Sequence, residues 1–107
     1  SAITNPKLLL PKVPAHRNHT WQTFHLLLDD SLEQPSVIST LKTRNIGANY
    51  GAQCIPAQTY YRNKYGLDAK QLFPNAYNAY TKGLAIPIYE RLTKDDILYI
   101  AQTVNEL

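Results

Sequence analysis

The placement of the seven prolines constrains this chain more than any other feature of its sequence. Pro6, Pro11 and Pro14 forbid a helix in the first eighteen residues and favour extended backbone, because proline lacks an N–H group and its ring clashes with a preceding helical turn. Residues 1–18 are therefore expected to be an extended linker that leads into a domain covering residues 19–107. A chain that begins in a linker has the form expected of a domain cut from a larger protein.

Three further prolines predict where helices begin. Proline suits the first turn of a helix, where its missing N–H would be unpaired in any case. Glycine and asparagine, which tolerate left-handed backbone, suit the residue after a helix. The predicted helices cover residues 35–44, 56–65 and 74–82, which begin at Pro35, Pro56 and Pro74 and are followed by Asn45, Gly66 and Gly83.

Apolar and aromatic side chains predict three strands between these helices, at residues 19–30, 46–52 and 84–89. The first has apolar side chains on both faces towards its end. The second is short and has glycines near its ends, which permit a bulge or a close approach of backbone. Pro87 cannot donate a ladder hydrogen bond, so the third is expected to be an edge strand or to carry a bulge.

The last helix has the clearest sequence signature. Thr93 and Asp96 form a capping-box pattern, and acidic residues in the first turn suit the positive end of the helix dipole. Four apolar residues then recur at helical spacing and are expected to line one face: Ile97, Ile100, Ala101 and Val104. The order β-α-β-α-α-β-α predicts an α+β fold, with a small sheet and its helices packed on one face.

Charge and cysteine content exclude several functional classes. The net charge is +3, and the eleven basic residues are scattered, so no stripe that would neutralise successive phosphates is present and nucleic-acid binding is not expected. No apolar run approaches the roughly 20 residues that span a bilayer, so no membrane association is expected. The single cysteine, Cys54, fits a reducing compartment, which predicts a cytoplasmic protein in which Cys54 is a small buried residue.

The residues alone give no complete catalytic or metal-binding set. His16, His19 and His25 lack the further ligands that zinc requires, so no metal site is expected. The aspartates suit turns and helix caps better than a pair for general acid–base chemistry: Asp29, Asp30, Asp95 and Asp96. No glycine-rich phosphate loop exists, because the four glycines lie far apart.

The segment Gly47–Tyr61 is the best candidate for contact with a ligand or partner. It contains three of the eight tyrosines of the chain. Tyr61 and Tyr65 share one face of the predicted helix at i,i+4 spacing. These tyrosines could pack their rings with the hydroxyl groups at the rim, or they could form an interface, where tyrosine is enriched. Taken alone, the residues predict a small α+β interaction or accessory module.

Several stretches, in order, resemble the C-terminal end of the DegT/StrS-type sugar aminotransferases. They are "LLLPKVPAHRNHTWQTFHLLLDD", "VISTLKTRNIGA", "CIPAQTYYRNKYG" and "FPNAYNAYTKGLAIPIYERLTKDDILYIAQTVNEL". The most specific stretch is Leu84–Tyr89 followed by Leu92, Thr93 and an acidic helix start. The resemblance covers nearly the whole chain after about residue 8, and it implies the small domain of such an enzyme, with a three-stranded, mostly antiparallel sheet.

The resemblance also implies a cofactor and partners. Members of this family use pyridoxal phosphate to transaminate nucleotide-linked keto-sugars, and their Schiff-base lysine and phosphate-binding residues belong to an upstream large domain. This chain would accordingly contribute no catalytic residue, would bind no cofactor alone, and would partner that large domain and the nucleotide-sugar within a homodimer. None of its lysines matches the cofactor lysine.

The resemblance places the segment Gly47–Tyr61 in the wall of the sugar pocket. The family pattern there often carries a His, an aromatic residue and a later His, where this chain has Gly51, Ala52 and Pro56. We expect the substrate contacts to come instead from five side chains: Asn49, Tyr50, Gln53, Tyr60 and Tyr61. The alternative function is a free-standing module that binds a protein through the tyrosine-rich helix, and a nucleic-acid module is a third.

Overall fold

The computed structural model describes residues 2–107, and these form an α+β fold, as predicted. Within them the sheet has three strands in the order β1-β2-β3: β1 (Leu8–Leu9), β2 (Phe24–Leu28) and β3 (Gly83–Ile86). Both pairs are antiparallel, with Leu8 opposite Leu28 and Leu26 opposite Leu84. The prediction of a small three-stranded antiparallel sheet is confirmed, and β3 is an edge strand that ends just before Pro87.

The helices of the described residues follow the proline and glycine positions closely. They are α1 (Gln34–Thr43), the short 3-10 helix η1 (Ile55–Ala57), α2 (Thr59–Tyr65), α3 (Ala69–Leu72), α4 (Pro74–Thr81) and α5 (Lys94–Asn105). Of the three residues expected to follow helices, Asn45 and Gly66 have left-handed backbone, with φ 57° and 62°, whereas Gly83 does not and begins β3. The predicted helices at 35–44 and 74–82 are confirmed.

Three local predictions are wrong. Residues 46–52 are not a strand but make one isolated bridge, between Asn49 and Ala85, because the chain turns at Gly51 with φ 68°. The strand expected at 19–30 is shorter, since Trp21 has left-handed backbone with φ 52°. The helix expected at 56–65 is divided at Gln58, whose extended backbone (ψ 139°) separates η1 from α2.

Two elements were not predicted. The helix α3 is one turn capped by Asp68, whose carboxylate accepts the Gln71 N–H at 3.1 Å. The strand β1 lies in the stretch expected to be a linker; it is extended, but the N–H of Asp29 also bonds to the carbonyl of Lys7 at 2.8 Å. The residues between Pro6 and Pro11 contain no proline, which leaves room for this short strand pairing.

The core lies between one face of the sheet and the two helices α1 and α5. Its buried apolar side chains come from all three strands, from both helices and from the segment that follows α1: Leu8, Leu26, Leu28, Val37, Leu41, Ile46, Leu84, Ile86, Ile100 and Val104. Because side chains alternate along a strand, Leu26 and Leu28 face this core and His25 faces away from it. Helices on one face of the sheet were predicted and are observed.

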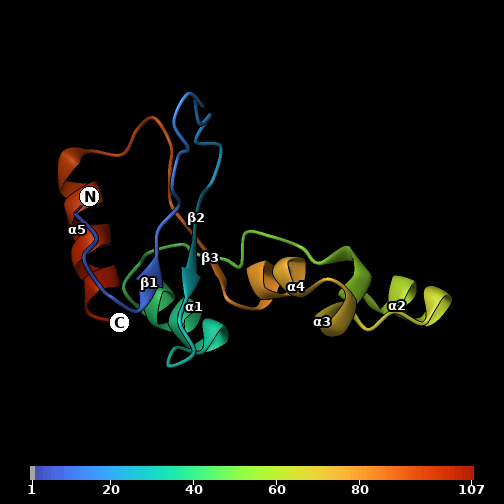
Figure 1. The fold of residues 1–107 in the computed structure, drawn as a ribbon. Coiled ribbons are helices and arrows are strands. Elements are labelled where there is room, and N and C mark those ends of the chain that lie inside the picture. The colour runs from blue at the N-terminus through green and yellow to red at the C-terminus, as the bar shows by residue number, and fades with distance from the viewer. Residues whose placement is uncertain (1) are drawn as a thin grey trace.

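The N-terminal segment is fastened to α5. The side-chain carbonyl of Asn105 accepts the N–H groups of Thr4 and Asn5 at 2.7 and 3.1 Å, and the amide of Asn5 donates to the Val104 carbonyl at 3.2 Å. Asn5 is itself buried. Residues 2–9 therefore belong to the body of the domain, and the two ends of the described chain lie side by side (Figure 1).

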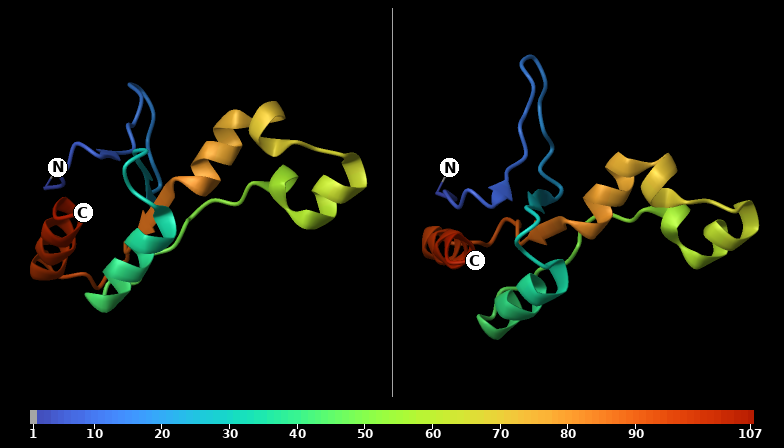
Figure 2. Two further views of the ribbon diagram at one scale, coloured as in Figure 1. Left: turned by 90° about the horizontal axis from the view of Figure 1, so that it is seen from below. Right: turned by 60° about the horizontal axis from the view of Figure 1, so that its bottom comes forward.

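Two segments project from this body. The stretch from about residue 10 to residue 23 leaves the sheet as a narrow loop, and residues 55–82, which carry η1 and α2 to α4, extend in another direction as a helical arm (Figures 1 and 2). The radius of gyration is 15.4 Å, whereas a compact domain of this length would have about 13 Å. The shape is thus that of a small packed body with a protruding helical arm.

The capping box on α5 is confirmed. The Thr93 hydroxyl oxygen accepts the N–H of Asp96 at 3.1 Å, and the Asp96 carboxylate accepts the N–H of Thr93 at 2.9 Å. Ile100, Ala101 and Val104 are buried, whereas Ile97, one turn from the cap, is 51% exposed and lines an apolar hollow together with Ile100 and Ala101.

Removing this cap gives a first prediction. We expect Thr93→Ala to lower the free energy of unfolding by about 1 kcal/mol at neutral pH, because it leaves an unpaired N–H in the first turn. The hydroxyl and the N–H of Thr93, in that order, hold the pKa of the Asp96 carboxyl below its ordinary value of 3.8. A carboxyl whose folded pKa is lowered stabilises the fold above its unfolded pKa, and this contribution is lost as the pH falls through the folded pKa.

Urea unfolding between pH 2 and 7, a range chosen to bracket ordinary carboxyl pKa values near about 4, measures both effects. Stability should decline below the ordinary carboxyl pKa, and Thr93→Ala should decline less steeply there because it removes the hydroxyl bond to the Asp96 carboxylate and leaves only the bond from the backbone N–H. Thr43→Ala is the matched control, since the Thr43 hydroxyl bonds to the Thr40 carbonyl at the C-terminal end of α1. Equal losses in the two variants would contradict the assignment of the cap.

Candidate functional site

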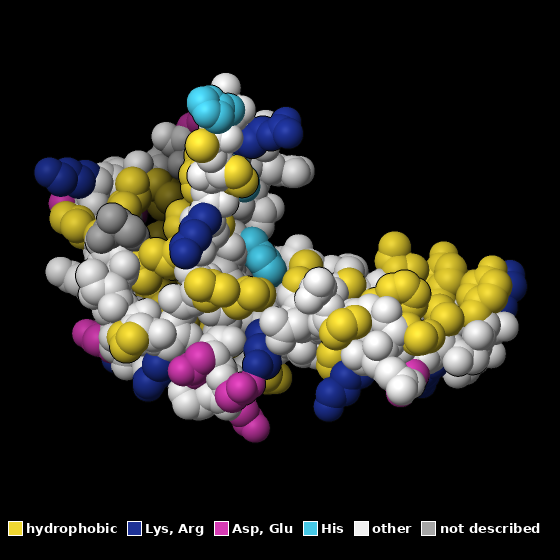
Figure 3. Space-filling model, in the orientation of Figure 1, with side chains coloured by type: hydrophobic (Ala, Val, Ile, Leu, Met, Phe, Trp, Pro, Cys, Tyr) yellow, Lys and Arg dark blue, Asp and Glu magenta, His cyan; other side chains and the backbone are white. Residues whose placement is uncertain are grey.

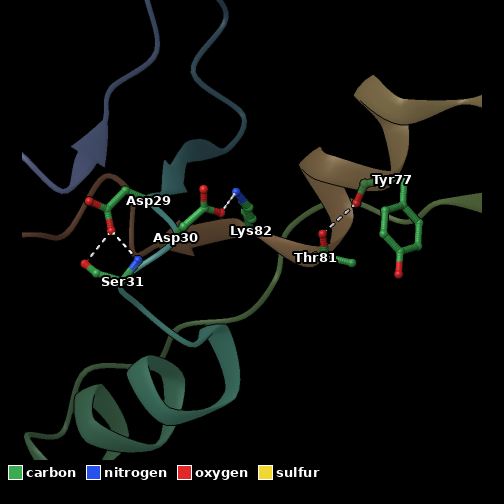
Figure 4. A network of polar contacts seen from close by, with 6 residues as sticks. All are labelled: Asp29, Asp30, Ser31, Tyr77, Thr81 and Lys82. Atoms are coloured by element: carbon green, nitrogen blue, oxygen red, sulfur yellow. Dashed lines mark hydrogen bonds and ion pairs between the residues drawn. The ribbon is translucent and has the colours of Figure 1, made fainter. Parts of the chain in front are cut away.

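The helical arm is fixed to the body where α4 runs into β3. The side-chain amide of Gln34, the first residue of α1, donates to the carbonyls of Tyr80 and Gly83 at 2.8 and 2.6 Å. Lys82 forms an ion pair with Asp30, and the Leu28 N–H bonds to the Lys82 carbonyl at 2.9 Å. Figure 4 shows this junction, with the Thr81 hydroxyl bonded to the Tyr77 carbonyl at 2.9 Å. The direction of the arm is therefore set by contacts with the start of α1 and with the end of β2.

A second network lies at the start of the β2–α1 connection. The hydroxyl and the N–H of Ser31 bond to the Asp29 carboxylate at 2.6 and 2.9 Å (Figure 4). These two bonds hold the pKa of the Asp29 carboxyl below its ordinary range, in the order given. Asp29 is thus a turn residue, as the sequence indicated, and Asp30 forms an ion pair that the sequence did not indicate.

The loop Gly47–Gln53 runs along the outer edge of β3. Asn49 bonds to Ala85 through both of its backbone groups, at 3.2 and 2.7 Å, and its side-chain oxygen accepts the Gly51 N–H at 2.6 Å. The Tyr50 carbonyl accepts the Ala52 N–H at 2.7 Å, which closes a tight turn. Asn49 therefore shapes the loop through its side chain, a role that the sequence did not indicate.

Tyr50 and Gln53, two of the residues expected to contact substrate, lie together in the loop. The Gln53 amide donates to the Tyr50 hydroxyl at 2.8 Å, and the Gln58 amide donates to the Gln53 carbonyl oxygen at 3.0 Å. The Tyr50 ring meets Tyr80 of α4 edge to face, with ring centroids 5.6 Å apart. This chain of amides links the loop to the first turn of α2 and orients two exposed polar side chains.

Tyr60 and Tyr61 form a separate aromatic group on α2. Their rings meet edge to face with centroids 5.1 Å apart, and Tyr61 stacks on Tyr65 at 6.4 Å, as the i,i+4 spacing predicted. The Lys64 ammonium donates to the Tyr60 hydroxyl at 3.1 Å and lies 5.4 Å from the Tyr65 ring centroid. All three rings are exposed, and Figure 3 shows the hydrophobic side chains gathered on the end of the arm.

The net positive charge of the chain is carried by the helical arm. Residues 55–82 contain four basic and one acidic side chain, whereas the rest of the chain contains seven of each. Arg62 and Lys64 stand among the three tyrosines of α2. The arm can therefore attract an anionic partner or ligand electrostatically, and it offers rings for stacking.

The sequence indicated no role for His25 other than that of a metal ligand, yet this residue lies at the candidate site. The His25 imidazole lies under the loop, with its Nε2 atom 3.3 Å from the Tyr50 carbonyl oxygen. The alternation of side chains along β2 puts His25 on the face of the sheet that points away from the core. The loop lies over this face because Asn49 forms a bridge with Ala85, a contact that the sequence does not reveal. Within residues 2–107, no group of three or more His, Cys, Asp or Glu could hold a metal ion.

Two other features complete the surface. Cys54 is fully buried, as predicted. An apolar hollow of about 280 Å³ lies beyond the end of β3, lined mostly by the segment after β3 and by α5: Phe24, Ile86, Pro87, Tyr89, Leu92, Ile97 and Ile100 among others. It presents almost no polar group that could orient a substrate, so we place the candidate site at the loop and the arm. No helix of the described chain has both the length and the apolar content to cross a bilayer.

Comparison with known proteins matches this chain to a family over most of its length. The model of the DegT/DnrJ/EryC1/StrS aminotransferase family matches residues 4–105. An uncharacterised protein of Methanocaldococcus jannaschii, MJ1066, is 30% identical over 94% of this chain and 26% of its own. The spore coat polysaccharide biosynthesis protein SpsC of Bacillus subtilis is 27% identical over 95% of this chain and 27% of its own.

A similar fold is found among solved structures. The PLP form of Spr1654 from Streptococcus pneumoniae, assigned as a sugar aminotransferase, matches with a TM-score of 0.74 at 20% identity, over 94% of this chain and 26% of that chain. This likeness bears on the fold alone. The chain spans about a quarter of the length of the relatives that it matches.

Proposed function

Because the chain belongs to the DegT/DnrJ/EryC1/StrS aminotransferase family, we propose that it forms the C-terminal small domain of a pyridoxal-phosphate-dependent aminotransferase. The substrate class that we propose for the whole protein is a nucleotide-linked keto-sugar, with an amino acid as amino donor. SpsC, a polysaccharide biosynthesis protein, and Spr1654, which has been solved in a PLP form, support the sugar and the cofactor respectively.

In this proposal the loop and the arm form part of the sugar pocket. The observation that carries it is the pair Tyr50 and Gln53, which are exposed and yet held in place by hydrogen bonds and by the Tyr80 ring. Preorganised polar groups beside aromatic rings suit a sugar, which presents hydroxyl groups and apolar ring faces. Tyr60 and Tyr61 would extend this wall, and Asn49 would support it by holding the loop through its side-chain bond to the Gly51 N–H.

The cofactor would be held elsewhere. Six of the seven lysines are exposed, and the seventh, Lys82, pairs with Asp30 at the arm junction. Lys7 and Lys64 are likewise engaged, with the Leu107 carbonyl and the Tyr60 hydroxyl. These residues do not fit a Schiff-base lysine enclosed beside an acid and a phosphate-binding loop. The carbanion chemistry that pyridoxal phosphate supplies would therefore belong to another domain of the same polypeptide.

That large domain is also the partner that we propose for the exposed apolar surface. The hollow beside α5 and the exposed Ile88, Tyr89 and Ile97 form an apolar face, and such faces mark interaction sites. The small domain would then close over the active site of a cytoplasmic homodimer. A protein-binding role for the tyrosines of α2 is the alternative that the same surface allows.

The full-length protein provides the test. We expect it to show the absorbance of bound cofactor at about 420 nm and to transfer an amino group from glutamate to a nucleotide-linked keto-sugar. Residues 1–107 expressed alone should show neither property, because none of their lysines lies in an enclosed cofactor-binding site. Cofactor binding by residues 1–107, or a full-length protein that binds the cofactor but transaminates only non-sugar ketoacids, would contradict the proposal.

A further inference from the structure

Three segments that are distant in the sequence meet around the imidazole of His25. His25 lies on β2 opposite Ala85 of β3, and Ala85 in turn pairs with Asn49 of the loop. Directly opposite residues of an antiparallel pair point to the same face of the sheet. The imidazole of His25 therefore crosses over the small side chain of Ala85 to reach the loop beyond it.

Two glycines leave the space that this ring occupies. A Cβ atom on Gly51 would lie 2.6 Å from Cδ2 of His25 and 2.9 Å from Cβ of Ala85. A Cβ atom on Gly83 would overlap with Nε2 of the same ring. The imidazole thus occupies a space that exists only because positions 51, 83 and 85 carry small residues.

The ring also holds the loop by a hydrogen bond. Its Nε2 atom lies 3.3 Å from the Tyr50 carbonyl oxygen, which can only accept, so Nε2 carries the hydrogen. The same oxygen accepts the Ala52 N–H, and a carbonyl has two lone pairs for these two donors. The turn at Tyr50–Ala52 is thereby tied to β2 as well as to β3.

We propose that His25 is a positioning residue for the loop Gly47–Gln53, which it holds in the conformation that directs Tyr50 and Gln53 outward. The consequence for the keto-sugar rests on the function proposed above, whereas the effect on the loop does not. The family pattern given by the resemblance often has a histidine at the position of Gly51. This chain has an imidazole on β2, in the space that a side chain at 51 would need.

Amide hydrogen exchange of the full-length protein tests the effect on the loop. In His25→Ala we expect exchange of residues 47–53 to rise by about tenfold or more, while α5 exchanges as in the wild type, because local opening leaves distant elements protected. His19→Ala is the matched control, because His19 contacts Trp21 within its own segment. Unchanged exchange at 47–53, or an equal rise in α5, would overturn the proposal.

A relocated imidazole provides a second test. Gly51→His alone should raise exchange of the loop strongly, because two side chains would compete for one space. The double variant His25→Ala/Gly51→His should exchange more slowly than Gly51→His, since it removes the closer of the two contacts at position 51 and His is among the residues that tolerate left-handed backbone. A double variant no better protected than Gly51→His would show that competition for one space does not couple positions 25 and 51.

Kinetics of the same variants separate this inference from the proposed function. For His25→Ala we expect the KM for the keto-sugar to rise about tenfold and the KM for the amino donor to stay within about twofold, as for loss of a binding interaction. Equal rises in both would overturn the positioning role. If the wild-type protein lacks transaminase activity, the proposed function fails, and the exchange measurements still decide the role of His25 in the loop.

Discussion

Gly83→Ala is expected to lower the free energy of unfolding by about 3 kcal/mol or more, because overpacking against backbone cannot be relieved by rotating a side chain. A Cβ atom at this position would overlap with the carbonyl oxygens of Ala79 and Tyr50 and with the His25 ring. Two of these three obstacles are main-chain atoms, one at the end of α4 and one in the loop. The substitution should therefore loosen the arm and the loop together.

Gly47→Ala is the matched control for this prediction. Gly47 lies at the start of the same loop, and a Cβ atom there would meet nothing within 4 Å. We expect its effect on stability to remain within about 0.5 kcal/mol. Urea unfolding of both variants, with near-ultraviolet circular dichroism of the tyrosines, makes the comparison. Similar losses at positions 47 and 83 would mean that the junction does not depend on close backbone contact.

The second large effect is expected in the core. Leu84→Ala should cost about 3–5 kcal/mol, as for other fully buried leucines whose removal leaves a cavity. Leu84 is completely buried and lies opposite Leu26, which is 1% exposed. Because a whole domain is stable by only about 5–15 kcal/mol, this loss would leave a small body with little remaining stability.

Leu9→Ala provides the corresponding control on the same sheet. Leu9 lies in β1 and is 60% exposed, so we expect a change within about 0.5 kcal/mol. The midpoint and the slope of urea unfolding should both be measured, since an unchanged slope shows that the variant unfolds from the same compact state. Equal effects at positions 9 and 84 would contradict the assignment of the core to the face covered by α1 and α5.

The arm junction connects these stability effects to the proposed function. Gln34 and Lys82 hold α4 to the body, and α4 presents Tyr80 to the ring of Tyr50. The aromatic group on α2 lies further out on the same arm. A change at the junction should consequently displace the proposed sugar wall without touching any of its side chains.

Part of the candidate site could be predicted from the sequence, because its contacts are short in range. Tyr61 and Tyr65 stack at i,i+4 on a helix, and Gln53 bonds to Tyr50 three residues away. The role of His25 could not be predicted in this way. Its partners at positions 50, 51 and 83 are 25 or more residues away, and they meet it only across the assembled sheet.

The sequence by itself determined where three of the helices begin. Pro35, Pro74 and the capping box at Thr93 set where α1, α4 and α5 begin, because proline geometry and cap hydrogen bonds act within one helical turn. Tertiary structure alone decided that residues 8–9 pair as a strand, that residues 46–52 do not, and that residues 55–82 project as an arm. A strand is stable only with a partner, and whether one is within reach depends on how the whole chain packs.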